Sequence, residues 1–284
     1  MTEPTTAPAN GAEANGSATN GAATSGSTPS APEDRSPRPA PPLRRILAHA
    51  ALEARILLSN GEQLMVAIVM PAMVLIGLRL LPLGRIEGVP AIDTAVAATF
   101  ATALISTSFT SQAIMTGFDR RNGVLRWVAT TPLGRDGYLA GKILATLATH
   151  VLQVVVLGLL ALVLGWRPEL LGLLAAVPVW LVGTVAFGAL GLLVAGTLRT
   201  EAVLAVSNLV FVVLVAAGGV AFPAAAYPRF LRGLVDLLPS GALGELLRAC
   251  LANGPFSAGS VVVLLLWAVA GVAAVIRWFR WTDV

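Results

Sequence analysis

Residues 170–197 read LLGLLAAVPVWLVGTVAFGALGLLVAGT, and this run decides the class of fold because it contains no charged side chain. A helix needs about 20 consecutive apolar residues to cross the hydrocarbon core of a bilayer. The run is longer than that, so it predicts a transmembrane helix over Leu170–Thr197. Pro178 is compatible with this, since neighbouring helices satisfy the backbone groups that a proline leaves unpaired. Gly188, Gly191 and Ala195 form a strip of small residues suited to close helix packing.

Five more apolar runs of similar length occur in the chain. We expect membrane spans at Gln63–Leu83, Ile92–Gln112, Tyr138–Leu164, Ala202–Ala221 and Gly259–Trp278. Of the 284 residues, 56% are hydrophobic and only 12% are charged, whereas an average soluble protein is about 25% charged. This composition excludes an ordinary cytosolic enzyme, and the single cysteine excludes a disulfide-stabilised scaffold. The sequence therefore predicts an all-α integral membrane protein with six transmembrane helices.

The chain changes character at residue 43. Residues 1–42 contain no Val, Ile, Leu, Phe, Trp or Tyr, so they bury too little apolar surface to offset the entropy of ordering and we expect a disordered cytoplasmic tail. Residues 43–60 show apolar side chains at helical spacing, with Arg45, His49 and Glu53 on the opposite face. This pattern predicts an amphipathic helix in the membrane interface, followed by a transmembrane domain over residues 61–284.

The basic residues indicate the orientation in the membrane. Thirteen of the 19 Lys and Arg residues fall on the side that holds the tail, the interfacial helix and residues 117–137, and six fall on the other side. Cytoplasmic loops carry an excess of Lys and Arg, so we expect both termini in the cytoplasm of a multi-pass cell-membrane protein. The net charge is only +4 and is scattered between apolar runs, which favours membrane lipid over nucleic acid as a partner.

The segment between the fifth and sixth spans, residues 222–258, is apolar but contains four prolines. Its two helical pieces, Phe230–Leu238 and Ala242–Leu251, are too short to cross a bilayer. They predict an outer re-entrant helical hairpin, which a membrane protein accommodates where the turn is shielded by protein.

The loop between the second and third spans reads MTGFDRRNGVLRWVATTPLGRDGYLAGK over residues 115–142. It predicts a short helix at Val124–Ala129 that ends before Pro132, because a proline disfavours helical geometry in the residue preceding it. A solvated linker has no need of a Trp among Val and Leu, whereas buried aromatic side chains dominate the energetics of protein interfaces. We expect Leu125 and Trp127 to fill a groove on a partner protein. The alternative is a helix that lies on lipid headgroups.

Side chains suited to catalysis are few and dispersed. The two histidines are far apart, and Gly137–Ile143 departs from a phosphate-binding loop in its spacing and its last residue. We therefore predict no catalytic, metal or nucleotide site in this chain. Polar residues within the third and fifth spans are candidates for a substrate pathway, with interhelical hydrogen bonding as the alternative: His150, Gln153, Ser207 and Asn208. A proton-coupled carrier or channel and an intramembrane enzyme are the competing function classes.

These features together resemble the permease subunits of type-two ATP-binding-cassette (ABC) exporters, the family that includes the daunorubicin-resistance permeases. The resemblance covers roughly residues 43–284. It rests on ARILLSNGEQL at residues 54–64, on SFTSQAIMTGFDRRNGVLRWVATTPLGR at 108–135, and on LVDLLPSGALGELLR at 234–248.

The resemblance implies a division of labour between subunits. The loop at 115–142 would be a coupling helix that docks on a separate ABC ATPase subunit, and that subunit would bind ATP and Mg²⁺. The residues of this chain that the resemblance assigns to docking are Arg121, Gly123, Val124, Leu125 and Trp127. It further implies a permease homodimer with two ATPase copies, moving a small hydrophobic or amphiphilic compound (a drug, an antibiotic or a lipid) outward.

Overall fold

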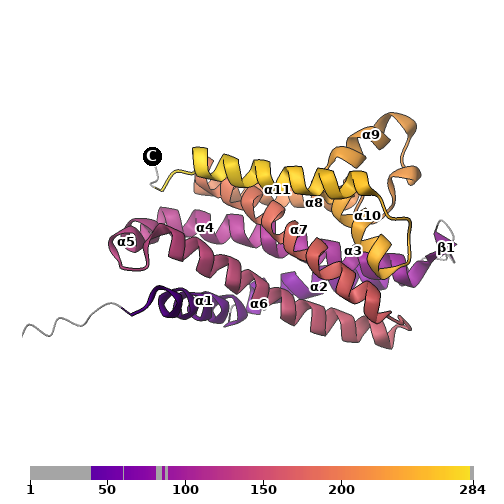
Figure 1. Ribbon diagram of the computed structural model, residues 1–284, viewed down its shortest axis with the longest axis horizontal. Coiled ribbons are helices and arrows are strands. Elements are labelled where there is room, and N and C mark those ends of the chain that lie inside the picture. The colour runs from indigo at the N-terminus through magenta and orange to yellow at the C-terminus, as the bar shows by residue number, and fades with distance from the viewer. Residues whose placement is uncertain (1–39, 60, 81–84, 87–88, 282–284) are drawn as a thin grey trace, which may run out of the picture. The chain divides into compact units, whose positions relative to one another are not determined.

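The structure is a computed structural model that describes residues 40–59, 61–80, 85–86 and 89–281 (Figure 1). The tail expected over residues 1–42 lies outside the described residues except for its last three positions. The end of the first expected span, residues 81–83, also lies outside them.

Helices make up nearly all of the described chain. They are α1 (Pro42–Ser59), α2 (Gly61–Leu80), α3 (Ala91–Ile105), the π-helix η1 (Ser106–Ser111), α4 (Gln112–Arg121), α5 (Val124–Thr130), α6 (Gly134–Val163), α7 (Leu170–Thr197), α8 (Thr200–Ala217), the 3₁₀ turn η2 (Ala224–Ala226), α9 (Arg229–Leu237), α10 (Pro239–Leu251) and α11 (Ala258–Trp278). The β structure among the described residues is one two-residue antiparallel ladder, β1 (Arg85–Ile86) with β2 (Val89–Pro90).

Among the described residues, five helices are long and apolar enough to cross a membrane, and they coincide with the second to sixth expected spans. This confirms an integral membrane protein with several spans. The first expected span corresponds to α2, whose apolar stretch Ala67–Leu80 is shorter than the other five. A membrane span at α2, and with it the total of six spans, therefore stays a prediction.

The second expected span is longer than the sequence indicated. Instead of ending at Gln112, the helix runs without a break through α3, η1 and α4 to Arg121, and its most apolar stretch is 89% buried. It contacts α2, α7, α8 and α10, so it is the central element of the bundle. A Cβ at Gly191 of α7 would lie 2.6 Å from the Phe109 carbonyl oxygen. The small-residue strip of α7 therefore allows the close backbone approach that its sequence predicted.

The segment between the fifth and sixth spans forms two helices, α9 and α10, at nearly the expected bounds. Pro239 occupies the first turn of α10, a position where the missing N–H of a proline has no cost. Helix α10 is largely buried against α3, α7 and α11, whereas α9 is mostly exposed. Both are shorter than a span, and their re-entrant position in the membrane stays a prediction.

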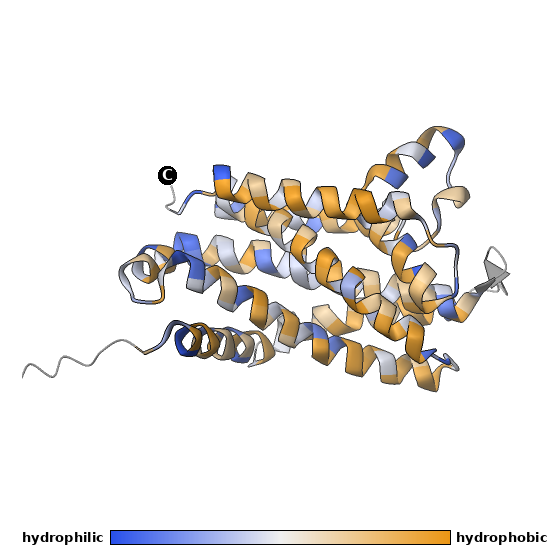
Figure 2. Ribbon diagram, in the orientation of Figure 1, coloured by the Kyte–Doolittle hydropathy of each residue, from blue (hydrophilic) through white to orange (hydrophobic). Residues whose placement is uncertain are grey.

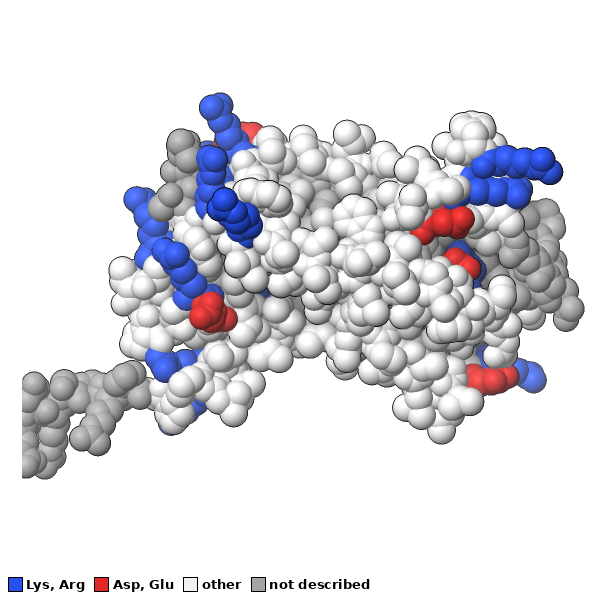
Figure 3. All heavy atoms as spheres, turned by 45° about the horizontal axis from the view of Figure 1, so that its top comes forward, with Lys and Arg blue, Asp and Glu red and all other residues white. Residues whose placement is uncertain are grey.

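The described bundle has two distinct ends. Helix α5, α1 and the last turn of α11 lie at one end, and α9 and β1 lie at the other (Figure 1). The long helices between them carry mostly hydrophobic residues (Figure 2). On the face in Figure 3, Lys, Arg, Asp and Glu gather at the two ends, with an uncharged belt between them. This distribution is typical of a protein that crosses a bilayer along the long axis of its helices.

Candidate functional site

A buried ion cluster joins three helices at the α5 end of the bundle. Lys142 of α6, the only lysine in the sequence, is 2% exposed. Its Nζ lies 2.8 Å from Asp119 Oδ2 of α4 and 3.1 Å from Glu53 Oε2 of α1. Burying an ammonium is costly unless it is paired, and here two carboxylates compensate it. We call Glu53, Asp119 and Lys142 the charge cluster.

Tyr138 lies one turn before Lys142 on α6 and extends the charge cluster. Its hydroxyl donates to Asp119 Oδ2 at 2.6 Å. Its ring stacks on His49 of α1, with ring centroids 5.2 Å apart, and lies 5.1 Å from Lys142 Nζ. Gly141 makes this contact possible, because a Cβ at that position would overlap the His49 ring. Helix α1 therefore packs directly on α6.

Helix α1 buries part of its polar face against the protein as well as part of its apolar stripe. The sequence places His49 and Glu53 on the polar face of an interfacial helix, but Glu53 is buried and His49 is largely covered. The reason is Lys142, whose buried charge needs the Glu53 carboxylate. Burial lowers the pKa of His49 below its usual 6.5, and the Glu53 carboxylate opposes part of that effect.

Helix α5 turns one side toward the charge cluster. The chain reverses at Gly123, whose φ of +74° favours glycine. Leu125 and Val128 are buried and form a small core with the ring of Tyr138. Trp127 points away from this core and is 69% exposed. We expected Leu125 and Trp127 to share a partner's groove, so the assignment of Leu125 is corrected: it anchors α5 on its own chain.

Two residues that follow α11 pack on the same core. Phe279 and Trp281 are partly buried against it, and the Arg135 guanidinium lies 4.9 Å from the Trp281 ring centroid. Phe279 fits against Gly196 at the end of α7, where a Cβ would overlap its ring. The core under α5 thus also contacts the ends of α7 and α11.

Two further contacts at this end of the bundle join segments that are far apart in the sequence. The Arg45 guanidinium of α1 donates to the Pro132 carbonyl between α5 and α6. Arg121, one of the residues assigned to docking, pairs with Glu201 of α8 at 3.0 Å, and both side chains are more than half exposed. An exposed pair of this kind contributes little to stability.

A second polar group lies in the middle of the bundle. His150 Nδ1 accepts from Trp180 Nε1 of α7 at 3.0 Å, and His150 Nε2 lies 3.3 Å from Ser108 Oγ of η1. Gln153 Nε2 donates to Thr107 Oγ1 of η1 at 2.8 Å and to the Ala67 carbonyl of α2 at 2.9 Å. The π-helix therefore offers two hydroxyls to α6, and π segments occur frequently at functional sites.

The structure brings together two of the four predicted pathway residues and separates the other two. His150 and Gln153 both contact η1, and His150 also lines an apolar cavity of about 320 Å³ between α6 and α7. Ser207 is buried on α8, and Asn208 is exposed on the same helix.

Sequence reasoning missed the charge cluster as a unit. The available signals were a single lysine among 18 arginines and the spacing of His49 and Glu53 four residues apart. Neither shows which residues meet, because Glu53, Asp119 and Lys142 come from three separated segments. Among the described residues, no group of three or more His, Cys, Asp or Glu side chains is placed to hold a metal ion.

Comparison with known proteins adds one match. A family model described as "ABC-2 type transporter" matches residues 50–252, which is more than half of the chain. The matched region includes the charge cluster, α5, the polar group around His150 and Gln153, and the α9–α10 segment. No curated protein matches the sequence.

Proposed function

Because the chain belongs to the ABC-2 type transporter family, we propose that it is the permease subunit of an exporter that is driven by ATP hydrolysis on a separate ATPase subunit. The ATPase subunit would hold ATP and Mg²⁺. Two permease chains and two ATPase chains would form the working complex in the cell membrane. The α5 end would face the cytoplasm, where thirteen of the 19 basic residues are expected.

The observation that carries this proposal is the two-sided construction of α5. Its inner side is fixed to the permease through Leu125, Val128 and Tyr138. Its outer side exposes Arg126 and Trp127 at the end of the bundle. A large exposed Trp on a short, anchored helix is the kind of side chain that fills a pocket on a partner protein. Arg121, Gly123 and Val124 border this surface, and we assign them to docking with Trp127.

The charge cluster supplies a route for coupling. A displacement of α5 by the ATPase acts on Tyr138, whose hydroxyl is bonded to Asp119. Asp119 and Glu53 both hold Lys142, so α1, α4 and α6 would move with α5 as one unit. Since α4 continues through η1, the same movement would reach the hydroxyls that bond His150 and Gln153.

The cargo that fits the interior is a small hydrophobic or amphiphilic compound, such as a drug, an antibiotic or a lipid. The cavity beside His150 is lined almost entirely by apolar side chains, with the imidazole and the Trp180 ring as its polar exceptions. Ser207 and Asn208 would contribute from α8, where the exposed Asn208 is available to cargo or to a second permease copy.

The proposal is tested by co-expressing the chain with a candidate ABC ATPase and measuring co-purification and ATP hydrolysis. Trp127→Ala is expected to reduce ATPase co-purification severely, because loss of an interface anchor costs about 2 kcal/mol or more. Trp278→Ala is the matched control: it removes a Trp of similar exposure (60%) at the end of α11, outside α5. Full ATPase binding by the Trp127 variant would place α5 on lipid headgroups and refute its docking role.

A further inference from the structure

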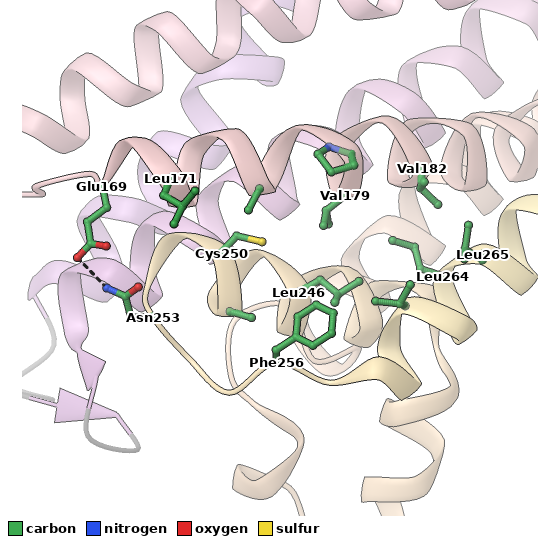
Figure 4. A pocket seen from close by; sticks show the side chains of 15 residues that line it. Glu169, Leu171, Val179, Val182, Leu246, Cys250, Asn253, Phe256, Leu264 and Leu265 are labelled. Carbon is green, nitrogen blue, oxygen red and sulfur yellow. Dashed lines mark hydrogen bonds between the residues drawn. The ribbon is translucent and has the colours of Figure 1, made fainter.

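A long apolar groove lies between α7, α10 and α11, near the end of the bundle opposite α5 (Figure 4). Its volume is about 550 Å³, which is typical of a small-molecule site. Leu246 and Leu264 are 1% exposed and form its floor, whereas Phe256 at its edge is largely exposed. Along α7 the lining extends from Glu169 to Val182, a length of about 20 Å at the helical rise per residue. The groove is therefore long enough to hold an extended apolar chain.

The groove is apolar along its length and charged at one end. Of the residues that line it, Glu169 is the only charged one, and it immediately precedes α7. Asn253, which follows α10, donates from Nδ2 to Glu169 Oε1 at 3.1 Å, as the dashed line in Figure 4 marks. Both side chains are exposed, so a ligand in the groove can reach this carboxylate with one end.

We propose that this groove binds an amphiphile with one long apolar chain and a cationic head. The chain lies along α7 over Leu246 and Leu264, and the head pairs with Glu169. A bilayer phospholipid is a poorer fit, because the phosphate beside any ammonium in its head opposes the pairing with the Glu169 carboxylate, whereas a head that carries only a cation keeps the full attraction. Treating this cation as cargo rests on the proposed export function, whereas its binding does not require the ATPase.

Cys250 provides a direct probe of the groove. It lines the groove, it is partly exposed, and it is the only cysteine in the sequence. The full chain is placed in phosphatidylglycerol nanodiscs, whose lipid heads carry no ammonium, and the rate at which an uncharged maleimide labels Cys250 is followed. Dodecyltrimethylammonium is the probe, compared with dodecyl sulfate and dodecyl maltoside at equal membrane-bound concentrations. We expect the cationic compound to slow labelling at concentrations where the other two have no effect.

Glu169→Gln tests the role of the charge. This variant should raise the concentration of dodecyltrimethylammonium needed for half-protection by about 1.5- to 5-fold, the effect of one exposed ion pair. Asp236→Asn is the matched control, because it removes an exposed carboxylate from α9 that does not line this groove. Equal protection by all three head groups, or an unchanged response in Glu169→Gln, would overturn the proposal and indicate an acyl chain of the bilayer instead.

A second measurement is used if Cys250 does not react with the maleimide even in the unliganded protein. Native mass spectrometry then counts the dodecyltrimethylammonium molecules that the wild-type chain and Glu169→Gln retain. Greater retention by the wild type supports the site, and equal retention refutes it. Both measurements use the chain without an ATPase, so a negative result leaves the docking role of α5 to its own test with Trp127→Ala.

Discussion

Tyr138 and Lys142 bind the same oxygen atom. The Tyr138 hydroxyl lies 2.6 Å and the Lys142 ammonium 2.8 Å from Asp119 Oδ2. The two residues are four positions apart on α6, so they lie on one face of that helix. The ring that supports α5 and the cation that holds α1 therefore meet at a single carboxylate of α4. This convergence joins α1, α4, α5 and α6 at the α5 end of the bundle.

The first prediction concerns the cation of the charge cluster. Lys142→Met would leave the buried Glu53 and the partly buried Asp119 without this counter-charge, and breaking a buried ion pair in this way costs about 3–5 kcal/mol. We expect a loss of that size in the free energy of unfolding, measured by denaturant titration in detergent. Arg121→Ala is the control, since its pair with Glu201 is exposed and should cost less than about 1 kcal/mol. Equal losses in the two variants would show that the charge cluster is not the stabilising contact.

A second prediction uses Gly141. Alanine there would overlap the His49 ring and lie 3.4 Å from the Ala50 amide nitrogen, so α1 would have to move away from α6. We expect Gly141→Ala to lower the thermal unfolding temperature and to increase proteolysis of α1. Gly77→Ala, also within a helix but with open space around its Cβ, should be neutral or slightly stabilising. A Gly141 variant as stable as the Gly77 variant would contradict the close packing of α1 on α6.

The third prediction is a dependence of stability on pH. Because burial lowers the pKa of His49 in the folded protein, the unfolded chain binds a proton more readily at this position. The contribution of His49 to stability is therefore complete above its unfolded pKa of about 6.5 and decreases as the pH falls below that value. His49→Gln should flatten the fall in unfolding temperature between pH 7.5 and pH 5.5, two values chosen to bracket the unfolded pKa. Identical slopes for the two proteins would contradict the assignment.

Much of this architecture can be predicted from the sequence, because the bilayer imposes a strong constraint on composition. An apolar run such as 170–197 has to form a helix in a membrane, and the helix bounds of α7 and α11 match their expected spans almost to the residue. Turn residues such as Gly123 and Pro132 likewise indicate α5 correctly. These are local signals, and each is carried by a few adjacent residues.

The site could not be predicted in the same way, because it depends on which helices touch. In the sequence, Glu53 lies in the expected interfacial helix, Asp119 in the loop and Lys142 in the third expected span, and only the packing of α1, α4 and α6 joins them. The prediction that Leu125 fills a partner's groove was wrong, because an apolar residue on a short helix can pack against its own chain as well as against a partner. Leu125 and Trp127 are two positions apart, so they lie on nearly opposite sides of α5, and only the side of Leu125 meets the core around Tyr138.

The fourth prediction concerns orientation. Reporters inserted near Gly134 and fused after Val284 should both report the cytoplasm, while a reporter at Glu169 should report the outside. The physical reason is the excess of Lys and Arg on the first side. Reporter activity in intact cells measures this directly. A cytoplasmic signal at Glu169 would reverse the membrane orientation and remove α5 from any contact with an ATPase.

The last prediction separates anchoring from docking within α5. Leu125→Ala removes a fully buried side chain from the core on Tyr138, and leucine-to-alanine changes in such cores cost about 2–5 kcal/mol. It should lower the unfolding temperature of the isolated permease and weaken ATPase stimulation as a consequence. Trp127→Ala removes an exposed side chain, so it should leave the unfolding temperature unchanged and still prevent ATPase binding. The two variants are measured side by side by thermal unfolding without the ATPase and by co-purification with it. If both variants destabilise the isolated permease equally, Trp127 is part of the fold and the outer side of α5 is not a docking surface. If neither affects ATPase binding, coupling passes through another element.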